Sequence, residues 1–142
     1  FLRGVQPCAT RSSMVERPNP EMGSIIIVIA TDAPLLPSQL QRVVKRASLG
    51  IGREGGIASN YSGDIFIAFS TGNRGSVPAR NVSVTPHEAL NPIFEGVVQA
   101  TEEAILNAMF AAETMTGVQG HRVTALSHDR VKDVLKKYNR LQ

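Results

Sequence analysis

The chain has 142 residues, 42% of them hydrophobic, which is enough for one ordinary domain or for part of a larger one. Its 15 basic and 12 acidic residues give a formal net charge of +3, and tryptophan is absent, so neither charge nor base-stacking side chains indicate a nucleic-acid-binding protein. The single cysteine excludes an internal disulfide framework, and neither a signal peptide nor an apolar run of roughly 18 residues is evident, so we expect a cytoplasmic protein outside the membrane.

Residues 1–23 form the first segment of the chain. They are polar, and prolines at positions 7, 18 and 20 interrupt them. This composition is typical of a linker or an extended arm, which would precede a folded portion at residues 24–142. Because the chain begins with Phe1 rather than methionine, we also expect that an upstream part is missing.

The first predicted strand covers residues 24–30. Five consecutive aliphatic residues, from Ile25 to Ile29, indicate a strand that is buried on both faces. Such a strand would hold Ser24 at its edge, and Gly23 leaves the preceding carbonyl open to the Ser24 hydroxyl. That geometry suits self-cleavage. Cleavage would give Ser24 a hydroxyl nucleophile and a free α-amine, with a reference pKa of roughly 8, that could act as its base.

A helix is predicted from Pro37 to about Gly50, where apolar residues follow helical spacing. The next residues, 50–55, match the dinucleotide-binding pattern G-x-G-x-x-G. That pattern binds phosphate only where it follows a strand and opens a helix. Here the order is reversed, so we expect a flexible connection that could border a substrate pocket, and we expect no cofactor.

The second predicted strand covers residues 63–70 and has polar side chains at its entrance. Ser62 and Asp64 are separated by two positions, which places both on one face if the strand has begun there. A hydroxyl and a carboxylate on one face could relay a proton or orient an amine. The alternative is a turn cap followed by a solvated strand edge.

A loop is predicted for residues 71–86, followed by the longest helix. Asn91 is its predicted N-cap, Pro92 lies in its first turn, and Gly117 lies beyond its end. We expect Glu113 on a solvated face, and a last helix after the cap residue Ser127. The histidines at positions 87, 121 and 128 lack ligand spacing, so no metal site is expected. The predicted buried stripe of the long helix consists of Phe94, Val97, Val98, Thr101, Ala104, Ile105, Ala108, Met109 and Ala112.

Three segments resemble the self-processing aminopeptidases of the DmpA type, which include L-aminopeptidase/D-amidase-esterases and β-peptidyl aminopeptidases. They are GSIIIVIATDAPL (residues 23–35), SGDIFIAFST (62–71) and AAETMTG (111–117), and they occur in the family's order. The resemblance runs from residue 23 to the C-terminus. It implies an α/β fold, the αββα sandwich that this family shares with ornithine acetyltransferases, of which this chain would supply roughly the β-subunit half.

The resemblance also implies roles for individual residues. Members cut themselves before a serine or threonine into α and β subunits, so Gly23-Ser24 would be the processing bond and Ser24 the nucleophile. Ser62 and Asp64 would complete the local catalytic set, although some members carry glutamate at the acidic position. The oxyanion-stabilising asparagine and part of the substrate pocket belong to the α subunit, and nothing here corresponds to them. We therefore expect this chain to be nearly inactive alone.

The expected partner is the α-subunit portion of the same precursor, and family members assemble several αβ pairs, commonly four. The expected substrates are amino-acid amides, esters or short peptides, hydrolysed through an acyl-enzyme. The base could be the α-amine of Ser24, or Ser62 backed by Asp64. Two alternatives stay open: an acyltransferase of the ornithine-acetyltransferase type, and a noncatalytic assembly fragment.

Overall fold

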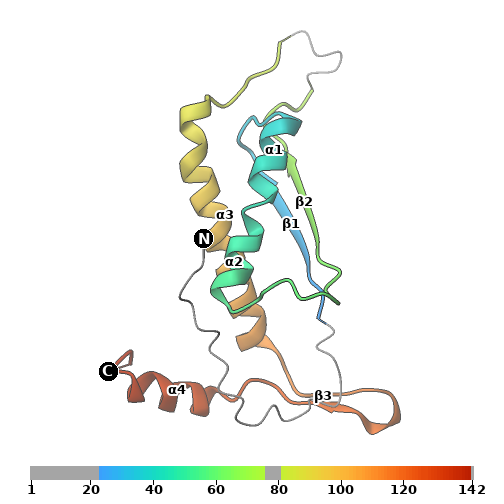
Figure 1. Ribbon diagram of the computed structural model, residues 1–142, viewed down its shortest axis with the longest axis vertical. Coiled ribbons are helices and arrows are strands. Elements are labelled where there is room, and N and C mark those ends of the chain that lie inside the picture. Colours follow the sequence, from blue (N-terminus) through green and yellow to red (C-terminus); the bar gives the residue numbers. More distant parts are fainter. Residues whose placement is uncertain (1–22, 76–80, 142) are drawn as a thin grey trace, which may run out of the picture.

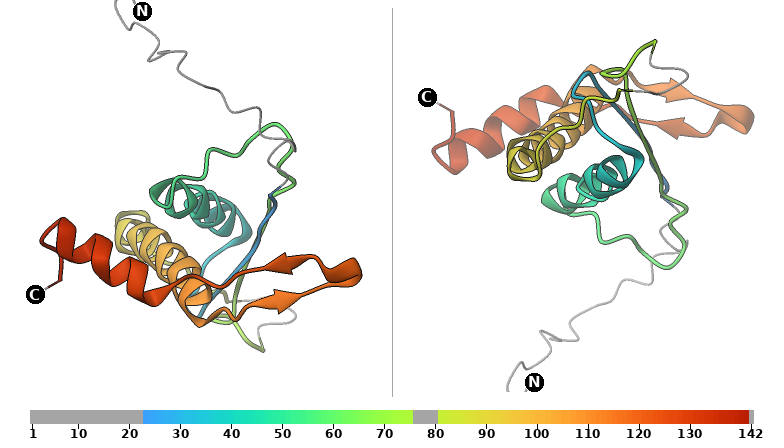
Figure 2. Two further views of the ribbon diagram at one scale, coloured as in Figure 1. Left: turned by 90° about the horizontal axis from the view of Figure 1, so that it is seen from below. Right: turned by 90° about the horizontal axis from the view of Figure 1, so that it is seen from above.

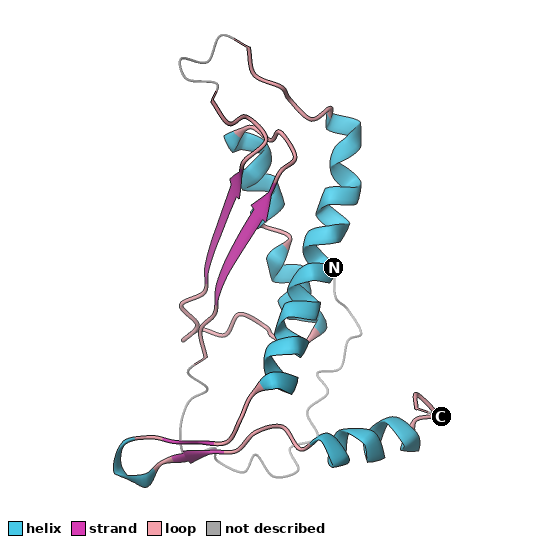
Figure 3. Ribbon diagram, turned by 180° about the vertical axis from the view of Figure 1, so that it is seen from behind, coloured by secondary structure: helices cyan, strands magenta, loops and turns pink. Residues whose placement is uncertain are grey.

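The computed structural model describes residues 23–75 and 81–141, so the predicted arm lies outside the described residues except for Gly23. No helix in these two ranges is both long enough and apolar enough to cross a membrane. Figures 1 and 3 show the order and arrangement of the elements. The chain runs through β1 (Ile26–Thr31), α1 (Pro37–Val44), α2 (Ala47–Arg53), β2 (Ile65–Ser70), a 3-10 turn (His87–Ala89), α3 (Leu90–Ala111), β3 (Met115–Thr116), a second 3-10 turn (Val118–Gly120), β4 (Arg122–Val123) and α4 (His128–Lys137).

β1 and β2 form a parallel pair, in which Ile26 lies opposite Ile65 and Thr31 lies opposite Ser70. Parallel strands need a crossover connection, which α1 and α2 provide. Figure 2, which views the molecule along its long axis, shows α1, α2 and α3 on one side of the strands. The hydrophobic core forms between these helices and the strand pair. Its buried side chains are Leu35, Val43, Leu90 and Val97.

The opposite face of the strand pair is open, whereas the sequence predicts burial on both faces. Exposed and half-buried residues alternate along both strands. The aliphatic run is typical of a strand between two layers, but the described residues supply only the helical layer. The large apolar side chains of this open face are Ile26 (68% exposed), Val28 (60%), Ile65 (54%), Ile67 (51%) and Phe69 (46%).

The predicted helix from Pro37 to about Gly50 is two helices in the structure. α1 ends at Val44, and α2 then continues to Arg53. Gly50 and Gly52 therefore lie inside a helix and not in a flexible connection, which corrects the sequence-based expectation.

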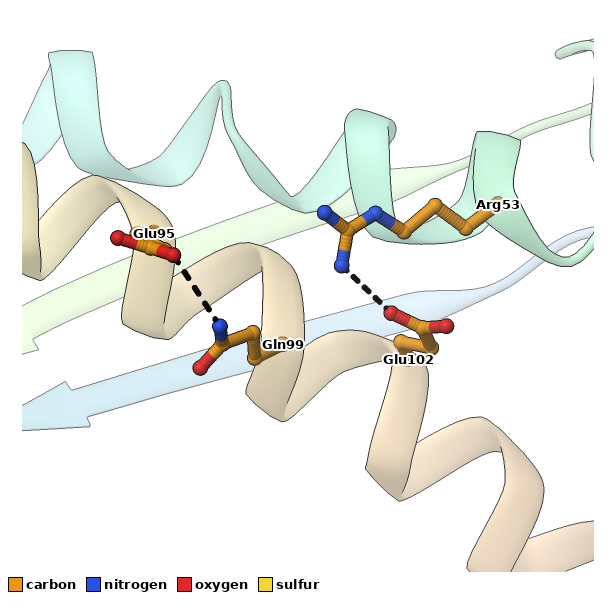
Figure 4. Close-up of polar contacts among 4 residues, drawn as sticks. All are labelled: Arg53, Glu95, Gln99 and Glu102. Carbon is orange, nitrogen blue, oxygen red and sulfur yellow. Dashed lines mark hydrogen bonds and ion pairs between the residues drawn. The ribbon is translucent and has the colours of Figure 1, made fainter.

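Packing of α2 against α3 explains why the chain stays helical through these glycines. A Cβ atom at Gly50 would lie 2.6 Å from the Cβ of Thr101 on α3, so only glycine allows this approach. The Arg53 guanidinium also pairs with Glu102 of α3 at 2.7 Å, as Figure 4 shows beside the Gln99–Glu95 contact within α3. Tertiary contacts thus override the low helix propensity of glycine.

α3 begins one residue earlier than the predicted cap. Its N-cap is Ala89, not Asn91, because a 3-10 turn leads directly into the helix, while Pro92 does lie in the first turn. The predicted buried stripe is buried only in its first half. Val98 is 8% exposed but Met109 is 46% exposed, since no described element covers the second half.

The C-terminal part contains a hairpin and α4. The β3–β4 hairpin was not predicted, because two-residue strands carry no alternating pattern. Ser127 does cap α4: its Oγ accepts a hydrogen bond from the Arg130 amide at 3.4 Å. No residue of α4 is buried.

Candidate active site

The parallel pairing of β1 and β2 brings the predicted site residues together. Both strands run in the same direction and start side by side, with Ile26 opposite Ile65. The residues that precede the two strands therefore meet at one end of the pair. Ser24 lies before β1, and Ser62 and Asp64 lie before β2.

Asp64 connects the two strand entrances. Its Oδ1 accepts a hydrogen bond from the Ile25 amide at 3.1 Å and another from the Ser62 hydroxyl at 2.5 Å. Since the Ile25 amide binds this side chain, regular strand pairing in β1 begins only at Ile26, two residues later than predicted. Asp64 and Ser62 are both half-buried. They continue the alternation of β2, so they lie on the same side of the chain as the residues of that strand that face the helices.

The Ser24 hydroxyl is positioned by backbone rather than by another side chain. Its Oγ accepts a hydrogen bond from the Gly63 amide at 3.0 Å. A Cβ atom at Gly63 would lie 3.4 Å from this oxygen, so glycine leaves room around the hydroxyl. Ser24 itself is exposed, which keeps one side of the hydroxyl open to solvent.

These three side chains line a common pocket of about 390 Å³. α2 contributes Ile51, and α3 contributes Ile105 and Met109, as apolar walls. The turn after α2 also reaches the pocket, so the glycine-containing segment does border it, a possibility that the sequence left open. The described lining residues are Gly23, Ser24, Ile25, Ile51, Glu54, Gly55, Gly56, Ile57, Ala58, Ser59, Ser62, Asp64, Ile105 and Met109.

The apolar wall residues of the pocket were not identifiable as site residues from the sequence. Ile105 and Met109 are four residues apart on α3, and this spacing predicted core positions of a buried stripe. It gave no signal that the second half of that stripe faces a pocket.

Glu113 does not belong to this pocket. It lines a separate groove of about 950 Å³ between the end of α3, the hairpin and α4. His87 contacts Arg42, and His128 contacts the Phe110 carbonyl at 3.0 Å. Within residues 23–75 and 81–141, no three His, Cys, Asp or Glu side chains come close enough together to hold a metal ion.

Comparison with known proteins places this chain in a family. The model of peptidase family S58 matches residues 3–123. The β-peptidyl aminopeptidase BapA of Sphingosinicella microcystinivorans is 50% identical over 98% of this chain and 35% of its own length.

Two solved structures share the fold. The L-aminopeptidase D-Ala-esterase/amidase of Ochrobactrum anthropi, a prototype for the serine aminopeptidases with a variant of the Ntn hydrolase fold, superimposes with a TM-score of 0.73. It is 43% identical over 82% of this chain and 34% of its own. A Burkholderia β-aminopeptidase gives a TM-score of 0.73 and 40% identity over 87% of this chain and 37% of its own.

The chain thus spans about a third of the length of the relatives that it matches. Its fold is the α/β fold of the DmpA-type Ntn hydrolases, as the sequence resemblance implies. Because the family model matches most of its length, this chain belongs to peptidase family S58.

Proposed function

We propose that this chain is the nucleophile-bearing part of a serine aminopeptidase, with Ser24 as the nucleophile. One observation carries the proposal: the Ser24 hydroxyl sits in a pocket with Ser62 and Asp64, and Asp64 binds both Ser62 and the backbone directly after Ser24. Family membership and the aminopeptidase relatives support the same chemistry.

Ser24 first has to become the N-terminal residue. In the proposed cleavage, its Oγ attacks the Gly23 carbonyl carbon, the carbon–nitrogen bond breaks, and the Ser24 nitrogen takes up a proton. Water then hydrolyses the resulting ester, which releases the Gly23 carboxylate and restores the hydroxyl. The exposed position of Gly23 and the Gly63 hydrogen bond to the Ser24 oxygen support this step.

The mature site would then cleave amides, esters or short peptides. Ser24 attacks the carbonyl of the substrate's N-terminal residue, an acyl-enzyme forms as the amine leaves, and water hydrolyses it. The freed α-amine of Ser24, or Ser62 backed by Asp64, accepts the proton during attack and returns it to the leaving amine.

The proposed partner is the complementary portion, meaning the part of a family member's chain that this chain does not match. The open face of the strand pair supports it, because parallel strands are normally covered on both faces. Among the described lining residues, none carries a side-chain amide that could stabilise an oxyanion. Lack of one such donor commonly costs about a hundredfold to a thousandfold in rate, so the chain alone should be nearly inactive. Assembly of several αβ pairs and a cytoplasmic location stay predictions.

The test is to co-express this chain with the complementary portion of the Sphingosinicella relative. Intact mass and N-terminal sequencing should reveal a chain that starts at Ser24, and the complex should hydrolyse amino-acid p-nitroanilides. Ser24→Ala should abolish both, whereas the exposed Ser48→Ala on α2 should leave both unchanged. Cleavage or turnover that survives Ser24→Ala would overturn the proposal.

A further inference from the structure

The pocket beside Ser24 is acidic. Its described lining contains two carboxylates, Glu54 and Asp64, and none of these lining residues is Lys, Arg or His. Asp64 is already engaged by the Ile25 amide and the Ser62 hydroxyl. Glu54 has no such partner among the described residues, so both of its carboxylate oxygens are open to a ligand.

Glu54 sits on an ordered turn at the end of α2. Its own amide donates to the Ile51 carbonyl at 3.1 Å, and the Gly55 and Gly56 amides donate to the carbonyls of Gly52 and Ile51 at 3.1 and 3.0 Å. Gly55 adopts a φ of +87°, a conformation that favours glycine and reverses the chain here. The backbone thus holds Glu54 at the pocket.

The charge of Glu54 has no role in stabilising the described fold. The adjacent base, Arg53, directs its guanidinium to Glu102 on α3 at 2.7 Å (Figure 4). Among residues 23–75 and 81–141, Glu54 makes no side-chain hydrogen bond or ion pair. A carboxylate at the end of a helix also faces the negative end of the helix dipole, which is unfavourable.

The remaining walls of the pocket are aliphatic. Ile51, Ile57, Ile105 and Met109 line the same space as Glu54. A side chain that fits both features has an apolar stem and a cationic end, as lysine does. A neutral aliphatic side chain would leave the Glu54 charge unpaired, and an acidic one would be repelled.

We infer that Glu54 is a specificity-determining residue that selects substrates whose N-terminal residue, the one attacked by Ser24, carries a basic side chain. This inference rests on the proposed aminopeptidase function and adds its substrate class. Because the Glu54 side chain is exposed, the contact is a solvent-exposed ion pair, for which about a two- to fivefold preference is expected.

The test compares lysine and norleucine p-nitroanilides, in the α- or β-amino form that the complex with the complementary portion hydrolyses. The two substrates share a four-carbon stem and differ in the terminal ammonium group. The native complex should favour lysine about two- to fivefold in kcat/KM, and Glu54→Gln should remove that preference by lowering only the lysine value. Glu103→Gln, an exposed change on α3 outside the pocket, is the matched control and should change neither value.

Two results would overturn the inference. Equal kcat/KM for both substrates in the native complex would show that the pocket does not distinguish a charged side chain from an uncharged one. An equal fall for both substrates in Glu54→Gln would assign Glu54 to the α-ammonium group that they share.

A binding measurement separates this inference from the proposed function. Lysinamide and norleucinamide can be titrated by calorimetry against a complex whose chain begins at position 24 and carries Ser24→Ala, with and without Glu54→Gln, so that no uncleaved arm remains at the pocket. Tighter lysinamide binding that depends on Glu54 supports the inference even if the native complex hydrolyses nothing, a result that would contradict only the proposed function. Equal binding of the two amides would overturn the inference whether or not the complex turns over substrate.

Discussion

At the scale of single residues, Asp64 is the connection between the two strand entrances. One oxygen, Oδ1, accepts hydrogen bonds from both the Ile25 amide and the Ser62 hydroxyl. Asparagine at this position could keep an acceptor oxygen in place but would lose the negative charge. The substitution therefore separates positioning from electrostatic support of a proton transfer.

We expect Asp64→Asn to lower turnover by the assembled enzyme about a hundredfold, because general acid–base assistance commonly contributes at least this much. Folding should be retained, as circular dichroism and the denaturation midpoint would show. Asp32→Asn, an exposed carboxylate just beyond the other end of β1, is the matched control. Unchanged turnover in Asp64→Asn would remove Asp64 from the proposed proton path and leave the Ser24 amine as the base.

That the three polar residues of the candidate site lie together could be predicted from sequence, whereas the pocket walls could not. Ser24, Ser62 and Asp64 lie at the entrances of two strands that local patterns identify, and parallel pairing joins those entrances. Ile51 and Met109 become wall residues only through the packing of α2 and α3. That packing depends on α2, which the sequence-based boundary cut short.

At the scale of elements, the two glycines of α2 have opposite roles. A Cβ atom at Gly50 would lie 2.6 Å from the Thr101 Cβ and 2.8 Å from the Val98 carbonyl oxygen of α3. A Cβ atom at Gly52 would meet nothing within 4 Å. Sequence patterns alone treat both residues as helix-weakening, because the difference arises from the neighbouring helix.

Alanine substitutions should separate the two roles. We expect Gly50→Ala to destabilise the fold by about 1–3 kcal/mol, since the backbone carbonyl of Val98 cannot move without shifting α3. Gly52→Ala should stabilise it by up to about 1 kcal/mol through improved helix propensity. Midpoints of urea unfolding, followed by circular dichroism, provide the comparison. Equal shifts in the same direction would contradict the α2–α3 packing described here.

The other differences between the predicted and observed elements also arise from contacts that lie outside each element. Composition and periodicity identified β1, β2, α3 and α4, because each contains a long pattern or a clear cap. They could not identify the β3–β4 hairpin, whose strands have two residues each. They also could not show that only the first half of α3 is buried, since periodicity reports an apolar stripe and not what covers it.

At the scale of the whole molecule, the open face of the strand pair is the feature without a partner among the described residues. Ile67 on this face is 51% exposed, although it sits between apolar neighbours on a parallel pair. The same strand pair holds Ser24 at its entrance. Covering this face would therefore shield the strands and place further residues near Ser24, the proposed nucleophile.

We expect Ile67→Asp to weaken association with the complementary portion by about a hundredfold or more, because a carboxylate would be buried without a partner. The isolated chain should tolerate the change, since the side chain faces solvent there. Val118→Asp, at an 83% exposed position in the hairpin, is the matched control and should not affect association. Titration of labelled chain with the complementary portion gives both affinities.

Hydrogen exchange of the same samples would locate the contact. Amides of β1 and β2 should become more protected on association, while those of the hairpin tip around Val118 should change little. If Ile67→Asp associates normally, the complementary portion does not cover this face. The activity expected on association would then have to depend on contacts elsewhere, and Ser24 would remain open on the side of the exposed strands.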